Sequence, residues 1–276
     1  MNAAIFTKST TGLIFASGLI AASSILGHAQ DAPIALGALA TSSLSGAYAT
    51  VPTGQATLGG HTFDMTSGTM IQLVNGGSAS FAGSYQNPKA VHLLLNTANT
   101  YDWLYAGNPV GTVVLTFSDG TTQSATLTSG GNVREWLISA YGVVNDVTDI
   151  TPNPSTPYVT KGVWTTTAVG GAGTAVIDML TIPVVTANAS KTLTGVQLND
   201  TNSWGSLQID LAGLTVEFAP PAPPTPQPTC SRPGESCTTP AAQNSQAWKW
   251  QPAVPGATNT NPNAKNTANA TPHKTH

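Results

Sequence analysis

The sequence predicts an all-β fold, an antiparallel jelly-roll β-sandwich followed by a disordered C-terminal tail. Between residues 46 and 218, short alternating or β-branched runs end repeatedly at Gly, Asn, Asp or Pro, a pattern typical of many antiparallel strands. No stretch of this region shows a capped apolar stripe at helical spacing. From residue 219 the composition changes abruptly to proline-rich sequence, which marks the end of the sandwich.

The N-terminal residues 1–29 have the three parts of a secretory signal peptide. Lys8 supplies the positive charge, residues 12–26 are apolar, and small residues precede a cleavage point near Gln30. A membrane anchor is the alternative, but the apolar stretch is shorter than the roughly 20 residues of a spanning helix, and serines interrupt it. We therefore expect a secreted or cell-surface, extracytoplasmic protein with no membrane span after signal cleavage.

Residues 30–45 are small and apolar without a strong period, and we expect them to form a lead-in segment to a sandwich spanning residues 46–218. The spacing of strand-like runs and turn residues favours a single sandwich or jelly-roll domain. The predicted strands cover residues 46–51, 70–74, 90–95, 134–139, 162–167, 174–182, 191–198 and 213–218. The longest loops expected between them, residues 96–109 and 141–161, are the places where function tends to collect.

The clearest local prediction is a β-hairpin over residues 111–127. Alternate residues Val113, Leu115 and Phe117 share one face of its first strand. The pair Asp119-Gly120 suits a tight turn, because Gly tolerates the positive φ that such a turn requires.

The C-terminal region divides into a Pro-rich linker, residues 219–229, and a tail, residues 230–276. Six prolines between Pro220 and Pro228 predict an extended polyproline II spacer, and the tail has too few apolar residues to bury a core. Cys230 and Cys237 are the only cysteines of the chain. In an oxidising compartment their spacing predicts one small disulfide loop; two free thiols are the alternative.

The charge distribution limits the classes of partner that the protein can bind. Charged residues make up only 8% of the chain, and residues 31–218 carry four Lys and Arg against eleven Asp and Glu. An acidic body of this kind does not favour nucleic acid as a partner.

The predicted sandwich lacks the residue patterns of most catalytic sites. His61 and His92 are the only histidines of the predicted sandwich, no G-x-S-x-G elbow accompanies them, and we expect His92 on a sheet face and His61 in a loop. Asp178 interrupts an otherwise apolar strand and, if buried, should be paired or hydrogen-bonded. A glycan-active hydrolase that uses an acidic pair such as Asp146 with Asp178 remains an alternative.

Aromatic residues in the predicted loops give the stronger functional signal. Sugar recognition uses flat aromatic faces for the apolar side of the ring and polar groups for its hydroxyls. For Trp103 and Trp204, exposure and burial are both open from sequence, whereas Trp136 is expected in the core of a strand. The predicted ligand-binding residues are Tyr101, Asp102, Trp103 and Tyr105 of the YDWLY segment, together with Arg134 and Trp204.

Several segments carry a resemblance to a known family: AVHLLLNT (90–97), VGTVVLTFSDGTTQSATL (110–127), GGNVREW (130–136), AVIDMLTI (175–182) and KTLTGVQL (191–198). In strand order and turn placement the body resembles the galactose-binding-like β-sandwiches appended to extracellular glycoside hydrolases and lectins. The resemblance implies a jelly roll of two antiparallel sheets, often with a structural calcium ion, and a ligand site on loops at one end. The residues themselves require no cofactor, and the runs 199–202 and 146–149 are the candidate calcium loops.

These observations favour a secreted, non-catalytic carbohydrate-binding, lectin-like protein whose partner is a glycan or cell-surface polysaccharide. The first alternative is a structural or adhesive cell-surface protein in which the sandwich is a spacer. The second is the small glycan-active hydrolase.

Overall fold

The computed structural model describes residues 29–152, 157–202 and 205–219. The predicted signal peptide apart from Ala29, the Pro-rich linker beyond Ala219, the predicted disordered tail, the Cys230–Cys237 disulfide and Trp204 lie outside the described residues. No helix in the described ranges is long and apolar enough to cross a membrane.

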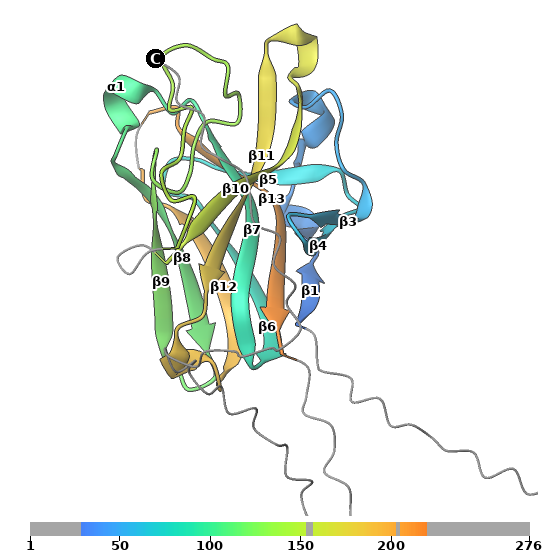
Figure 1. The fold of residues 1–276 in the computed structure, drawn as a ribbon, viewed down its shortest axis with the longest axis vertical. Coiled ribbons are helices and arrows are strands. Elements are labelled where there is room, and N and C mark those ends of the chain that lie inside the picture. Colours follow the sequence, from blue (N-terminus) through green and yellow to red (C-terminus); the bar gives the residue numbers. More distant parts are fainter. Residues whose placement is uncertain (1–28, 153–156, 203–204, 220–276) are drawn as a thin grey trace, which may run out of the picture. The chain divides into compact units, whose positions relative to one another are not determined.

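The described chain is built almost wholly of β-strands (Figure 1). In chain order these are β1 (Gln30–Ile34), β2 (Ser42–Ser43), β3 (Gly54–Leu58), β4 (His61–Met65), β5 (Thr69–Leu73), β6 (Ser78–Gln86), β7 (Pro88–Ala98), β8 (Pro109–Phe117), β9 (Thr122–Thr128), β10 (Val159–Thr167), β11 (Thr174–Pro183), β12 (Thr192–Asp200) and β13 (Gln208–Phe218). One single-turn helix, α1 (Asp102–Tyr105), follows β7, and 3-10 turns occur at Gly37–Leu39, Leu44–Gly46, Val169–Gly171 and Thr186–Asn188.

Two antiparallel sheets form the body. One has the order β10-β11-β7-β13-β5-β2, with β1 also paired to β13, and the other has the order β6-β12-β8-β9. The chain passes repeatedly from one sheet to the other between β5 and β13, as the predicted jelly roll requires. The predicted fold class, an all-β antiparallel sandwich, is confirmed.

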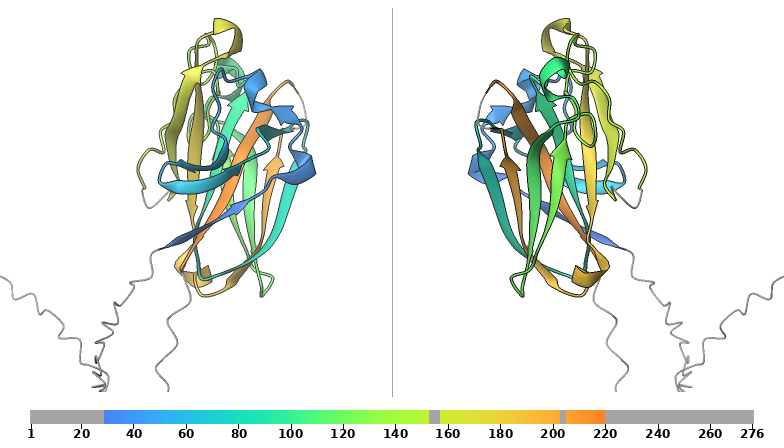
Figure 2. Two further views of the ribbon diagram at one scale, coloured as in Figure 1. Left: turned by 90° about the vertical axis from the view of Figure 1, so that its right-hand side faces the viewer. Right: turned by 90° about the vertical axis from the view of Figure 1, so that its left-hand side faces the viewer.

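A third, two-stranded sheet, the β3–β4 hairpin, lies on the outer side of the larger sheet (Figure 2). The larger sheet therefore has two buried faces. Strand β7 shows this directly: Val91, Leu93 and Leu95 belong to the core between the two sheets, whereas Leu94 packs with Phe63 of the hairpin in a second core. Because both faces are covered, β7 is buried almost throughout rather than on alternate residues.

The predicted hairpin of residues 111–127 is confirmed as β8 and β9. Val113, Leu115 and Phe117 are all buried in the inter-sheet core. Gly120 has the positive φ (81°) expected of the turn.

The structure differs from the sequence-based prediction in three segments. Residues 30–45 are not a separate lead-in, because β1 pairs with β13 along its whole length. Residues 46–51 form only an isolated bridge at Tyr48, and residues 134–139 only bridges at Glu135 and Leu137. The backbone of residues 135–136 bonds instead to a loop and to β7, since Glu135 N–H donates to the Val144 carbonyl and Trp136 N–H donates to the Thr97 carbonyl.

Phe63 tests the energetic role of the second core, because its side chain is fully buried between the hairpin and the larger sheet. Phe63→Ala is expected to lower the free energy of unfolding by about 3–5 kcal/mol, through lost burial and the cavity left behind. Thr57→Ala, at an exposed position of β3, is the control and should change it by less than about 1 kcal/mol. Equal midpoints in denaturant for the two variants would contradict this role.

Candidate functional site

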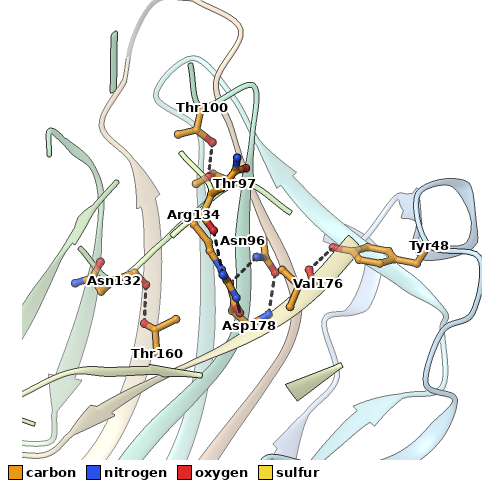
Figure 3. A network of polar contacts seen from close by, with 10 residues as sticks. Tyr48, Asn96, Thr97, Thr100, Asn132, Arg134, Thr160, Val176 and Asp178 are labelled. Carbon is orange, nitrogen blue, oxygen red and sulfur yellow. Dashed lines mark hydrogen bonds and ion pairs between the residues drawn. The ribbon is translucent and has the colours of Figure 1, made fainter. Parts of the chain in front are cut away.

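A buried ion pair lies at the end of the sandwich where β7 and β11 meet the long loops (Figure 3). Asp178 of β11 is fully buried, and its two carboxylate oxygens accept hydrogen bonds from Nε and Nη2 of Arg134, both at 2.8 Å. Asn96 of β7 donates to Oδ2 of Asp178 at 3.0 Å and accepts from the Asp178 N–H. The expectation that Asp178 is paired if buried is confirmed.

The same arginine fixes a loop. Nη1 of Arg134 donates to the carbonyl of Asn145 at 3.0 Å, and the Asn145 side chain donates to the carbonyl of Ala140. Hydrogen bonding to Asp178 raises the pKa of Arg134, so the guanidinium keeps its charge. Arg134 therefore positions the loop of residues 140–146, and three of its donors are used within the protein.

A second buried carboxylate fixes the neighbouring loop. Oε2 of Glu135 accepts hydrogen bonds from both the N–H and the hydroxyl of Thr100, each at 2.9 Å. The hydroxyls of Thr97 and Thr100 lie 2.6 Å apart (Figure 3). Burial raises the pKa of Glu135, against the effect of the Thr100 hydrogen bonds. These hydrogen bonds thus fix the segment between β7 and α1 at Thr100.

The two loops are also joined through their backbones. Val144 N–H donates to the Thr100 carbonyl, and Asp102 N–H donates to the Gly142 carbonyl at 3.1 Å. Tyr101 and Val143 form an antiparallel bridge. The loop of residues 140–146 therefore supports the start of helix α1, and we call these two bonded segments, residues 100–102 and 140–146, the base of α1.

This base carries three exposed aromatic side chains, Tyr101, Trp103 and Tyr141, which we call the aromatic platform. Trp103 is 76% exposed, Tyr101 is 39% exposed and Tyr141 is fully exposed. The rings of Tyr101 and Trp103 are stacked, with centroids 6.2 Å apart and planes inclined by 26°. Tyr141 was not among the residues predicted from sequence; its place in a loop, before Gly142, was the available signal.

The other predicted residues have different positions. Asp102 is exposed, and its Oδ1 caps the N–H of Trp103 at 2.6 Å. Tyr105, in contrast, is buried in the inter-sheet core, and its hydroxyl accepts from Nδ2 of Asn202 at 3.3 Å. Tyr105 therefore faces the interior and offers no ring to a ligand.

The described residues on either side of Trp204 adjoin the α1 loop. Asn202 reaches the Tyr105 hydroxyl, and the Asn99 side chain donates to the carbonyl of Ser206 at 2.9 Å. Trp204 itself lies outside the described residues.

An open groove of about 370 Å³ lies beside the loop that follows Arg134. It brings together two cationic side chains, one carboxylate and several apolar side chains. The lining residues are Arg134, Asp146, Val147, Ile150, Val159, Thr160, Lys161 and Gly162.

The carboxylate of Asp200, in one candidate calcium loop, is engaged in ordinary turn bonding. Its Oδ1 accepts from the Asn202 N–H at 2.8 Å and its Oδ2 accepts from the Gly76 N–H at 3.3 Å. Burial raises the pKa of Asp200. These contacts explain the carboxylate without an ion.

Comparisons with protein-family models, curated proteins and solved structures gave no match.

The Arg134–Asp178 pair can be tested by removing its cation. Arg134→Met is expected to lower the free energy of unfolding by about 3–5 kcal/mol, because it leaves the Asp178 carboxylate buried without its counter-charge. Lys161→Met removes an exposed cation nearby and should have a small effect. The double variant Arg134→Met/Asp178→Asn should be more stable than Arg134→Met alone; equal stabilities by denaturant unfolding would refute the charge argument.

The burial of Asp210 in β13 predicts that the stability of the folded protein depends on pH. Asp210 is buried opposite Asn96, one of its carboxylate oxygens has no hydrogen-bond partner among the described residues, and burial raises its pKa to about 7. Between pH 4 and pH 7 the unfolded chain has lost this proton and the folded protein retains it, so this group lowers stability as pH rises.

Asp210→Asn should remove that effect. Relative to the native sequence, the variant is expected to gain stability from pH 4 to pH 8 by as much as about 4 kcal/mol. The comparison between the two proteins is needed because His92, whose pKa burial lowers to about 4, acts with the opposite sign over pH 4 to 6.5. A stability difference that is constant with pH would show that Asp210 ionises normally in the folded protein.

Proposed function

We propose that the protein is a secreted, non-catalytic, lectin-like protein that binds a glycan or cell-surface polysaccharide through the aromatic platform. The observation that carries the proposal is the exposure of Tyr101, Trp103 and Tyr141 on a base fixed by buried polar groups. Large aromatic side chains usually bury most of their surface, and these three lie outside both hydrophobic cores.

The chemistry of the platform suits a sugar. The stacked rings of Tyr101 and Trp103 offer flat apolar faces to the C–H side of a pyranose. The exposed carboxylate of Asp102, between them in sequence, can accept hydrogen bonds from sugar hydroxyls. The fixed base also limits the conformational entropy that binding would otherwise lose.

The contacts of Asp178 argue against the hydrolase alternative. An acidic pair requires carboxylates that reach the substrate, one of which can release or take up a proton. Asp178 is fully buried, and both of its oxygens accept from Arg134. The pair Asp146 and Asp178 therefore lacks an accessible second carboxyl group.

The structural or adhesive alternative is tested by binding itself. A spacer needs no exposed aromatic platform, whereas a lectin depends on it. The two hypotheses predict different results for the same substitutions.

Trp103→Leu is expected to weaken glycan binding at least about tenfold, because leucine keeps apolar character but loses the flat face. Trp103→Phe should retain most of the affinity. Binding would be measured by affinity electrophoresis against a panel of soluble polysaccharides and by glycan array.

Val169→Ala, at an exposed apolar position on the turn between β10 and β11, is the matched surface control. It should leave the affinity unchanged. If no polysaccharide or glycan in either assay binds the native protein, the lectin proposal fails. If binding occurs but Trp103→Leu matches the native affinity, the platform is not its site.

A further inference from the structure

The β3–β4 hairpin meets β1 and β13 on the outer side of the larger sheet (Figure 1). A compact group of polar side chains lies there. His61 begins β4, His92 lies in β7 and Glu217 lies near the end of β13. Each offers one ligand atom, and these three atoms lie within 4.8 Å of one another. Among the described residues, no other group of three or more His, Cys, Asp or Glu side chains is close enough to hold a metal ion.

We propose that His61, His92 and Glu217 bind a divalent transition-metal ion, with Zn²⁺ as the simplest occupant. Two imidazoles and one carboxylate form a ligand set that Zn²⁺ accepts, and three protein ligands leave a fourth position open. Such nitrogen ligands select transition metals over calcium, which prefers oxygen.

The distances already approach those of a coordinated ion. Nε2 of His92 and Oε2 of Glu217 are 3.2 Å apart. Two ligand atoms on a tetrahedral zinc ion, each about 2.0–2.1 Å from it, are separated by roughly 3.4 Å. The rings of His61 and His92 are stacked at 3.6 Å with an interplanar angle of 22°. A bound ion requires the rings to tilt apart, because the lone pairs of stacked rings run side by side.

The surroundings of the two histidines match the outer contacts of metal ligands. Nδ1 of His61 lies 3.0 Å from Oδ1 of Asp31, whose other oxygen accepts from the Thr62 N–H. Nδ1 of His92 lies 3.0 Å from the hydroxyl of Thr181. A partner on one ring nitrogen orients the ring and directs the other nitrogen toward the metal. For His61 this leaves Nε2, for which the described residues provide no hydrogen bond.

The charges also favour a cation. Asp31 and Glu217 are directly opposed across β1 and β13, where two like charges destabilise a sheet. A divalent ion beside Glu217 would offset the repulsion between the carboxylates.

An ion can reach the site from solvent. The side chains of His61 and Glu217 are 22% and 24% exposed, whereas His92 is 2% exposed. His92 lies six residues before the end of β7, about 20 Å along the strand from the loop that carries the aromatic platform. The proposal is therefore independent of glycan binding.

The test uses the full-length chain, freed of metal with a chelator and titrated with Zn²⁺ by calorimetry. We expect one saturable site per chain that His61→Gln and Glu217→Gln each weaken at least tenfold. Asp31→Asn leaves the three ligands in place and should weaken binding about 10–100-fold through the orientation of His61.

The histidines His273 and His276 provide the matched control. Their double substitution by Gln should leave the affinity unchanged. As a second readout, saturating Zn²⁺ should raise the melting temperature of the native chain and not that of His61→Gln. The absence of saturable Zn²⁺ binding would overturn the proposal. A Zn²⁺ site that persists in His61→Gln and Glu217→Gln, but disappears when His273 and His276 are replaced by Gln, would also overturn it.

Discussion

The carboxylate of Asp178 is fully buried in β11, and a charge in that position is tolerated only with a counter-charge and satisfied hydrogen bonds. Arg134 supplies both, but it comes from the long loop region after β9 rather than from a neighbouring strand. Meeting this requirement brings residues 134–146 over the end of the larger sheet. The loop that carries α1 then bonds to these residues, so the geometry of the aromatic platform depends on the Arg134–Asp178 ion pair.

The larger sheet is covered on both sides, by the smaller sheet and by the β3–β4 hairpin, and this explains where polar chemistry remains on its outer face. The second core ends near the turn at Gly59, where φ is +63° and a Cβ would lie 2.6 Å from Met179. Beyond this turn, polar contacts replace the apolar ones. They involve His61, His92, Asp31 and Glu217. The polar group therefore lies where burial is incomplete, a place that lets charged side chains stay partly solvated and reachable by an ion.

Local patterns predicted the parts of the fold whose partners are close in sequence or whose strands alternate clearly, such as the β8–β9 hairpin and the strands around residues 174–182, 191–198 and 213–218. They failed at residues 134–139, because this strand-like run makes only isolated bridges to β7 and β11 and bonds to a loop, without a continuous ladder. They missed β1, since Pro33 and small residues give no alternation, although β13 pairs with it. Among the predicted site residues, Trp103 is exposed, a point that the sequence left open, and Tyr105 is buried because it packs against strands distant in sequence. The His61, His92 and Glu217 group comes from three strands far apart in sequence, so no local motif announces it.

Helix α1 has only four residues, too few for a helix to be stable by itself in water. Its conformation must therefore come from outside: from the Gly142 carbonyl, the Glu135 carboxylate below Thr100 and the Tyr105 side chain held in the core. The residues of this one pentapeptide therefore have different roles. The buried side chain of Tyr105 holds the segment against the core, and Tyr101 and Trp103 remain exposed in a fixed arrangement. Because these two exposed side chains contribute to neither core, selection can act on them through what they contact outside the molecule.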